Sequence, residues 1–146
     1  MKVGFTGPRL GMTDLQYAKL THELHRLGAT QLHHGDCRGS DEQADQIAAD
    51  LGIYRVAHPP TSTGLRAFCA SEEIREPAPF IVRDHTIVLE TEILIGTPDR
   101  PEYRRSGTWT TLRYARRIQR PIIAITPAGI ALEGDAIWAG RPTGVS

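Results

Sequence analysis

Residues 103–115 read YRRSGTWTTLRYA, a short polar loop that opens a helix after an apolar segment at residues 91–97. The first N–H groups of a helix have no partner within it, and a glycine at this position lets a phosphate approach the backbone closely. Arg104, Arg105 and several hydroxyl groups lie beside those donors. The junction therefore predicts a binding site for an anion such as a phosphate.

The same alternation of strands and helices extends outward over most of the chain. We expect strands at residues 2–6, 30–33, 53–57, 91–97 and 121–126, and helices at residues 13–27, 40–51, 80–90 and 107–119. Thr13 or Asp14 is expected to cap the first helix and Ser40 the second. The order predicts an α/β fold with a doubly wound, mostly parallel, Rossmann-like sheet, in which ligands bind beyond the carboxyl ends of the strands.

Two segments do not fit this alternation. Residues 58–79 are rich in Pro, Ser, Thr and Gly, which predicts a long connection with at most one helical turn, at residues 65–71. Residues 127–146 form a tail with four glycines, expected to pack on the same domain or on a neighbouring subunit. We therefore expect one domain, built from residues 1–126 and this tail.

Composition limits the classes of function. The 146 residues are 40% hydrophobic and 23% charged, as in a globular domain. Seventeen basic and seventeen acidic residues cancel, which argues against a global positive field for nucleic-acid binding. Cys37 and Cys69 have no CxxC spacing, and neither a signal peptide nor an apolar run of about 20 residues is found. We expect a cytoplasmic protein without a membrane role.

Three loops after predicted strands carry the residues of the candidate site. Parallel strands bring their carboxyl ends to one edge of a sheet, so we expect these loops to meet there. The predicted ligand- or phosphate-binding residues in them are Thr6, Gly7, Arg9, Gly35, Arg38, Gly39, Ser40, Ser106, Gly107 and Thr108. Trp109 and His58 are candidates for contact with a base. Packing in the protein core is the preferred alternative for Trp109, and packing or exposure to solvent is the alternative for His58.

The same loops carry a family resemblance. The segments GDCRGSD at residues 35–41 and RSGT at 105–108 resemble the signature loops of DNA processing protein A, and TGPR at 6–9 resembles the end of its first strand. The wider group is the SLOG superfamily of Rossmann-like nucleotide-binding domains, which also contains the lonely-guy phosphoribohydrolases and proteins once labelled lysine decarboxylases. The resemblance spans about residues 2–126.

The hydrolases of this superfamily carry a pattern that this sequence matches in part. Arg83 matches their early helical arginine, Gly107 and Thr108 match their Gly-Thr pair, and Glu92 stands where they have aspartate. Thr111 occupies the position of their catalytic glutamate. Cleavage of an N-glycosidic bond through an oxocarbenium-like state needs a carboxylate, which threonine lacks. The resemblance then implies that Arg83 and Thr111 bind a ligand phosphate, with a salt bridge to a neighbouring acid as the alternative for Arg83.

We therefore predict binding of a phosphorylated nucleotide or nucleotide-derived molecule, by a sensor or sequestering protein without the conventional hydrolytic glutamate. Two alternatives stay open. A nucleoside monophosphate phosphoribohydrolase would use Arg83 with a displaced carboxylate such as Glu92 or Glu102. A single-stranded DNA binder would resemble DNA processing protein A, although scarce lysine and zero net charge weigh against it. The resemblance also implies a homo-oligomer.

One further cluster has the residue types of metal ligands. His33, His34, Asp36 and Cys37 are close in sequence, but neighbours in a strand point to opposite faces, so the two histidines do not serve one ion in regular backbone. The second ligand pair that is typical of zinc sites is not found in the sequence. We predict no metal and no cofactor.

Overall fold

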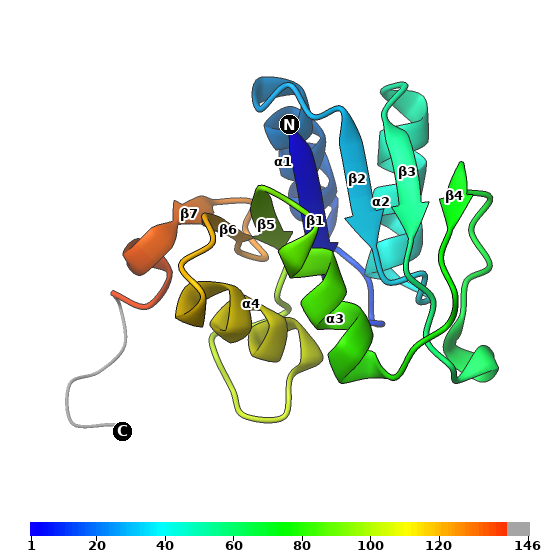
Figure 1. Ribbon diagram of the computed structural model, residues 1–146. Coiled ribbons are helices and arrows are strands. Elements are labelled where there is room, and N and C mark those ends of the chain that lie inside the picture. The colour runs from blue at the N-terminus through cyan, green and yellow to red at the C-terminus, as the bar shows by residue number, and fades with distance from the viewer. Residues whose placement is uncertain (140–146) are drawn as a thin grey trace.

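A seven-stranded sheet organises the protein, seen here in a computed structural model that describes residues 1–139 (Figure 1). The strands are β1 (Lys2–Thr6), β2 (Gln31–His34), β3 (Tyr54–Ala57), β4 (Glu73–Ile74), β5 (Ile93–Gly96), β6 (Ile122–Ile125) and β7 (Ala131–Glu133). The helices are α1 (Asp14–Arg26), α2 (Ser40–Asp50), α3 (Phe80–Leu89) and α4 (Gly107–Arg117), with 3-10 turns η1 (Thr63–Leu65) and η2 (Gly134–Ile137).

The strand order is β4-β3-β2-β1-β5-β6-β7, so β1 lies in the middle of the sheet. All neighbours are parallel except β6 and β7, and Gly4 of β1 lies opposite His33 on one side and Leu94 on the other. The helices α1 and α2 cover one face, whereas α3 and α4 cover the other (Figure 1). The predicted doubly wound, mostly parallel α/β sheet is confirmed.

This topology creates a crevice between β1 and β5. The chain leaves β1 toward α1 on one face and leaves β5 toward α4 on the opposite face, so the two loops diverge at the carboxyl ends of neighbouring strands. A divergence of this kind is where open α/β sheets bind ligands. The fold therefore places residues 6–9 and 97–106 on two sides of one opening.

Each face of the sheet has its own apolar core. Alternate residues of a strand point to opposite faces, so neighbours such as Leu94 and Ile95 enter different cores. The core under α1 and α2 comprises Val3, Phe5, Leu20, Leu24, Leu32, Ala44, Ile47, Ala48, Ile53, Ile93, Ile95, Ile123 and Ile125. The core under α3 and α4 comprises Ile87, Val88, Leu94, Trp109, Leu112, Ala115, Ile122, Ala124 and Trp138.

Helix caps explain where the first two helices begin. Thr13 accepts a hydrogen bond from the N–H of Gln16, whose side chain accepts one from the N–H of Thr13, so α1 starts with a capping box. The prediction that Ser40 caps α2 is wrong. Gly39 takes that position with a φ of 89°, a region that favours glycine, and the Ser40 hydroxyl donates to the carbonyl of Pro8 over 2.7 Å. Ser40 thus joins the loop after β2 to the loop after β1.

The structure adds elements in the two segments that lacked a clear pattern. Residues 58–79 contain β4, which pairs with β3, and their helical turn lies at Thr63–Leu65 instead of within residues 65–71. In the predicted tail, β7 pairs with the edge of β6 and η2 follows it. Residues 140–146 of the tail lie outside the described residues. Over residues 1–139, every helix is too short or too polar to cross a membrane.

Candidate ligand-binding site

A cavity of about 340 Å³ opens at the crevice between β1 and β5. Its walls come from four places: the loop after β1, the loop after β2, the first two turns of α3, and the segment that leads into α4. Eight of the predicted site residues line it, namely Thr6, Gly7, Arg9, Gly35, Arg83, Ser106, Gly107 and Thr108. The three loops singled out in the sequence therefore meet in one hollow.

The N-terminus of α4 forms one wall. Ser106 caps this helix: its Oγ accepts from the N–H of Trp109 over 3.1 Å, and its carbonyl accepts from the N–H of Thr110 over 2.9 Å. The first two N–H groups, those of Gly107 and Thr108, have no acceptor among the described residues. A helix start with unpaired N–H groups carries partial positive charge, so this wall suits an anion.

Arg83 of α3 also lines the cavity and is only 7% exposed. Its Nη1 donates to the carbonyls of Gly35 and His58, the latter over 3.3 Å, and lies 3.7 Å from the Sγ of Cys37. Its Nε lies 2.7 Å from the Oδ1 of Asp84, but the N–H does not point at that oxygen. Arg83 Nε is therefore a buried donor without a hydrogen-bond acceptor in the described chain.

Only glycine fits at position 35, because the guanidinium of Arg83 occupies the space that a side chain would need. A Cβ atom at this position would collide with the guanidinium and would come within 2.9 Å of the Oδ2 of Asp41. The glycine that follows β2 therefore lets the backbone approach the Arg83 guanidinium closely.

Two carboxylates line the cavity with Arg83. Burial raises the pKa of Asp41 and outweighs the opposing effect of Arg83; the same balance raises the pKa of Asp84. Asp41 accepts a hydrogen bond from the N–H of Cys37 over 3.2 Å, and Asp84 contacts the hydroxyl of Thr111 over 3.3 Å. Burial opposes the charge of Arg83, but these two acids raise its pKa overall, so it is a cation.

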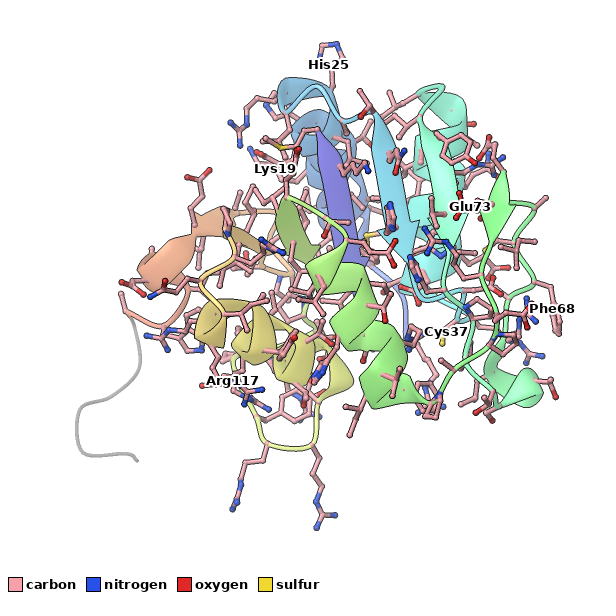
Figure 2. All side chains as sticks on the ribbon, in the orientation of Figure 1. Lys19, His25, Cys37, Phe68, Glu73 and Arg117 are labelled. Atoms are coloured by element: carbon pink, nitrogen blue, oxygen red, sulfur yellow. The ribbon has the colours of Figure 1, made fainter. Side chains whose placement is uncertain are left out.

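Cys37 lines the same cavity as a neutral thiol. It follows β2 in the chain, and Figure 2 shows it beside α3, beyond the carboxyl end of β2. Burial and the charge of Asp41 raise the pKa of its thiol, and Arg83 only partly offsets them. A nucleophilic cysteine needs the thiolate, so this position favours packing over reactivity.

Four predicted site residues of the loop after β2 and of α4 lie outside the cavity lining. Arg38 is exposed, and its N–H donates to the carbonyl of Leu65. Gly39 and Ser40 lie behind the lining, where they pack on the loop after β1. Thr111 is buried, with its hydroxyl 2.9 Å from the carbonyl of Gly107, so it touches the site only through Asp84.

The two candidates for base contact are both packed inside. The ring N–H of Trp109 donates to the carbonyl of Arg100 over 3.0 Å, and the ring meets Trp138 edge-on. His58 is 3% exposed, and its Nε2 lies 2.9 Å from the Nδ1 of His33. Neither side chain lines the cavity, so the packing alternative describes both.

The two displaced carboxylates considered for hydrolysis also lie elsewhere. Glu92 precedes β5 and accepts from the N–H of Lys2, which places it at the amino edge of the sheet, opposite the cavity. Glu102 accepts a hydrogen bond from Arg113 over 3.0 Å and does not line the cavity. The carboxylates that do line it, Asp41 and Asp84, were missed because a phosphate site is expected to be basic.

The histidines of β2 face two different neighbourhoods, as their strand positions require. His33, His58 and Glu90 bring three potential ligand atoms within 4.8 Å of one another, and His34, Asp45 and Cys69 do the same. Protein contacts already engage these atoms: His34 Nε2 lies 2.8 Å from Asp45, and Glu90 pairs with Arg75 over 2.8 Å. Burial lowers the pKa of His33 to about 4 and that of His58 to about 3, so both rings are neutral at pH 7.

The fold and this crevice define a Rossmann-like α/β domain. No protein-family model and no curated protein matches the sequence, whereas solved structures share its fold. The resemblance stated from the sequence is therefore confirmed at the level of the fold.

Three solved structures illustrate this likeness. The molybdenum cofactor binding protein from the phototrophic bacterium Rippkaea orientalis is 22% identical with a TM-score of 0.68, and the match covers 86% of this chain and 76% of that one. The Moco carrier protein from Chlamydomonas reinhardtii is 19% identical with a TM-score of 0.63, with the same coverage. DNA processing protein A from Streptococcus pneumoniae is 18% identical with a TM-score of 0.64; the match covers 84% of this chain but only 49% of that protein.

Proposed function

We propose that this protein binds a phosphorylated nucleotide or nucleotide-derived molecule in the cavity between β1 and β5, as a sensor or sequestering protein. The observation that carries the proposal is a helix start beside a cation. The N–H groups of Gly107 and Thr108, which have no acceptor among the described residues, begin α4 at the cavity, and Arg83 lines the same cavity. A phosphate accepts hydrogen bonds from such N–H groups and is attracted by the guanidinium charge.

The rest of the cavity supports a ligand larger than a phosphate ion. Its volume of about 340 Å³ lies within the range of pockets for small organic ligands, and Phe5, Phe80 and Ile87 add apolar surface to the lining. Arg9 and Arg105 are exposed at the cavity and add positive charge to attract an anion. The similar structures include proteins named for binding or carrying the molybdenum cofactor, which is consistent with a cargo-binding role.

Titration calorimetry tests this function directly. Purified protein is titrated with the four common ribonucleoside 5′-monophosphates, with the matching nucleosides and with inorganic phosphate. We expect saturable binding of at least one monophosphate and at least about tenfold weaker binding of its nucleoside, a difference of about 1.4 kcal/mol. Native mass spectrometry of protein purified from its host identifies a retained ligand. Binding that is indifferent to the phosphate contradicts the proposal.

Hydrolysis is a second candidate because a carboxylate does lie beside Thr111. Asp84 touches Thr111, which stands where the hydrolase pattern has its catalytic glutamate, although Asp84 reaches that place from α3. Incubation with the same monophosphates and chromatography for free base separates the two functions. Steady release of base that is lost in Asp84→Asn would replace the binding proposal. Release that persists in Asp84→Asn would point to a contaminating hydrolase.

Single-stranded DNA binding is the remaining outcome to separate. Arg104 and Arg105 are exposed in the loop before α4. A gel shift at moderate salt that disappears in the double variant Arg104→Glu/Arg105→Glu would favour a DNA binder, since phosphate-backbone contacts depend on such cations. The binding proposal expects no such shift.

A further inference from the structure

Asp84 brings a carboxylate into the cavity beside the first turn of α4. Its Oδ2 lies 3.3 Å from the hydroxyl of Thr111, and the same hydroxyl lies 2.9 Å from the carbonyl of Gly107. A threonine hydroxyl has one proton to donate, and the shorter contact to Gly107 takes it. Oδ2 of Asp84 therefore has room to accept further hydrogen bonds from a ligand.

The other oxygen of Asp84 has a different task. Oδ1 lies 2.7 Å from the Nε of Arg83, so it balances the charge of that side chain. The two oxygens thus divide between an internal ion pair and the cavity. If Asp84 only held Arg83 in place, Oδ1 alone would be needed. Oδ2, which contacts Thr111, would have no part in that role.

The charges of the lining restrict what Asp84 can face. The described lining holds three arginines, Arg9, Arg83 and Arg105, and two acids, Asp41 and Asp84. A second anionic group of the ligand placed beside Asp84 would meet repulsion in a partly desolvated site. A group with hydroxyl donors would instead supply hydrogen bonds to this half-buried carboxylate.

Position tells which part of the ligand carries those donors. Thr111 lies four residues beyond Gly107, about one helical turn or 5.4 Å along α4, and Asp84 touches Thr111. The group that reaches Asp84 is therefore the one bonded directly to a phosphate at the helix start. In a nucleoside 5′-phosphate that group is the ribose, whereas the base lies further away.

We propose that Asp84 accepts hydrogen bonds from the ribose hydroxyl groups of the bound nucleotide, so that the site selects ribonucleotides over nucleotides that lack the 2′ and 3′ hydroxyls. This proposal rests on the function proposed above. It assigns Arg83 and the start of α4 to the phosphate and Asp84 to the sugar. The base would then contact the other residues that line the cavity.

The test compares matched ligands on the intact protein. Titration calorimetry measures the best-bound ribonucleoside 5′-monophosphate against its 2′,3′-dideoxy analogue. We expect at least about tenfold tighter binding of the ribonucleotide, because hydrogen bonds to a charged group are among the stronger ones. In Asp84→Ala the preference should fall to within about twofold, a loss of the same hydrogen-bond contribution. Asp84→Asn keeps the size of the side chain and so guards against misfolding. In this variant the preference for the ribonucleotide should also shrink.

Asp50→Ala is the matched control, since it removes an exposed carboxylate at the end of α2 and should leave the preference unchanged. Equal binding of the two ligands by the native protein, or a preference that both Asp84 variants keep, overturns the ribose assignment alone. Failure of every nucleotide to bind overturns the proposed function and this assignment with it. If only the ribose assignment fails, the protein still binds the nucleoside monophosphate more tightly than its nucleoside.

Discussion

The Oγ of Ser106 accepts a hydrogen bond from the backbone N–H of Trp109 over 3.1 Å, which starts α4 at the wall of the cavity. This single contact does two things. It satisfies the third N–H of the helix, and it leaves the N–H groups of Gly107 and Thr108 for a ligand. Ser106 therefore contributes to both the stability of the fold and the binding of a ligand, and an experiment can separate the two contributions.

Ser106→Ala should lower both stability and ligand affinity. Loss of a serine cap costs about 1 kcal/mol, measured as the free energy of unfolding in urea. Affinity for a nucleoside monophosphate should fall as well, because the start of α4 is less well ordered. Thr13→Ala removes the cap of α1, away from the cavity, and should cost similar stability while affinity stays the same. Equal affinity losses in the two variants would mean that the cap acts only through stability.

Gly35→Ala should displace Arg83 and abolish ligand binding. The added methyl group would collide with the guanidinium, and an overpacked site costs about 1–3 kcal/mol in stability. Gly64→Ala is the control, because a Cβ atom there meets nothing within 4 Å. Thermal unfolding and titration calorimetry report the two effects. Native affinity in Gly35→Ala would show that the position of Arg83 does not matter for binding.

Arg83→Lys should weaken phosphate binding by at least about tenfold, since an ammonium group does not reproduce the planar fork of a guanidinium. It should also lower the free energy of unfolding, because contacts to the carbonyls of Gly35 and His58 are lost in a buried place. The nucleoside without phosphate serves as the reference ligand in the same calorimetric experiment. If its affinity drops as much as that of the monophosphate, Arg83 does not bind the phosphate.

The His33–His58 pair should make the protein less stable in mild acid. Burial lowers their pKa values to about 4 and about 3. The unfolded chain, with an ordinary histidine pKa near 6.5, then binds more protons between pH 6.5 and those values, so stability falls as pH falls. We expect the two histidines together to lower the free energy of unfolding by about 6 kcal/mol from pH 7 to pH 4, about 3 kcal/mol each, since one pKa unit corresponds to about 1.4 kcal/mol.

Urea unfolding at a series of pH values measures this slope, and His58→Gln should remove much of it. Asp41 and Asp84, whose pKa values are raised, act in the opposite direction over this range and are common to both proteins. His25→Gln is the control, because His25 projects from the end of α1 (Figure 2). An identical slope in native protein and His58→Gln would disprove the role of the pair.

The predictions that succeeded rest on features that do not need tertiary contacts. Glycines at 28 and 52 and the apolar spacing of the helices locate most elements to within a few residues. The parallel topology then brings Thr6, Gly35 and Ser106 to one edge of the sheet, since all follow carboxyl ends of strands. The sheet and the three loops of the site are accordingly readable from sequence.

What the sequence did not reveal depends on packing between distant elements. The strand β4 has two residues and exists only through its pairing with β3. The place of Asp84 beside Thr111 requires that α3 pack on α4, and adjacency to Arg83 in sequence suggested only a salt bridge. Trp109 follows the site residues directly, and the helix turns it into the core against Trp138, as the packing alternative expects. Direction of a side chain, unlike spacing, is set by neighbours from elsewhere in the chain.

The lengths of the two outer strands limit how copies of this chain can associate. The sheet ends in β4, with two residues, and in β7, with three. Strands this short offer few unpaired N–H and carbonyl groups, so neither edge is a good template for a strand from another molecule. The homo-oligomer that the sequence resemblance implies would have to join through helices and loops, and the sheet would end within each subunit.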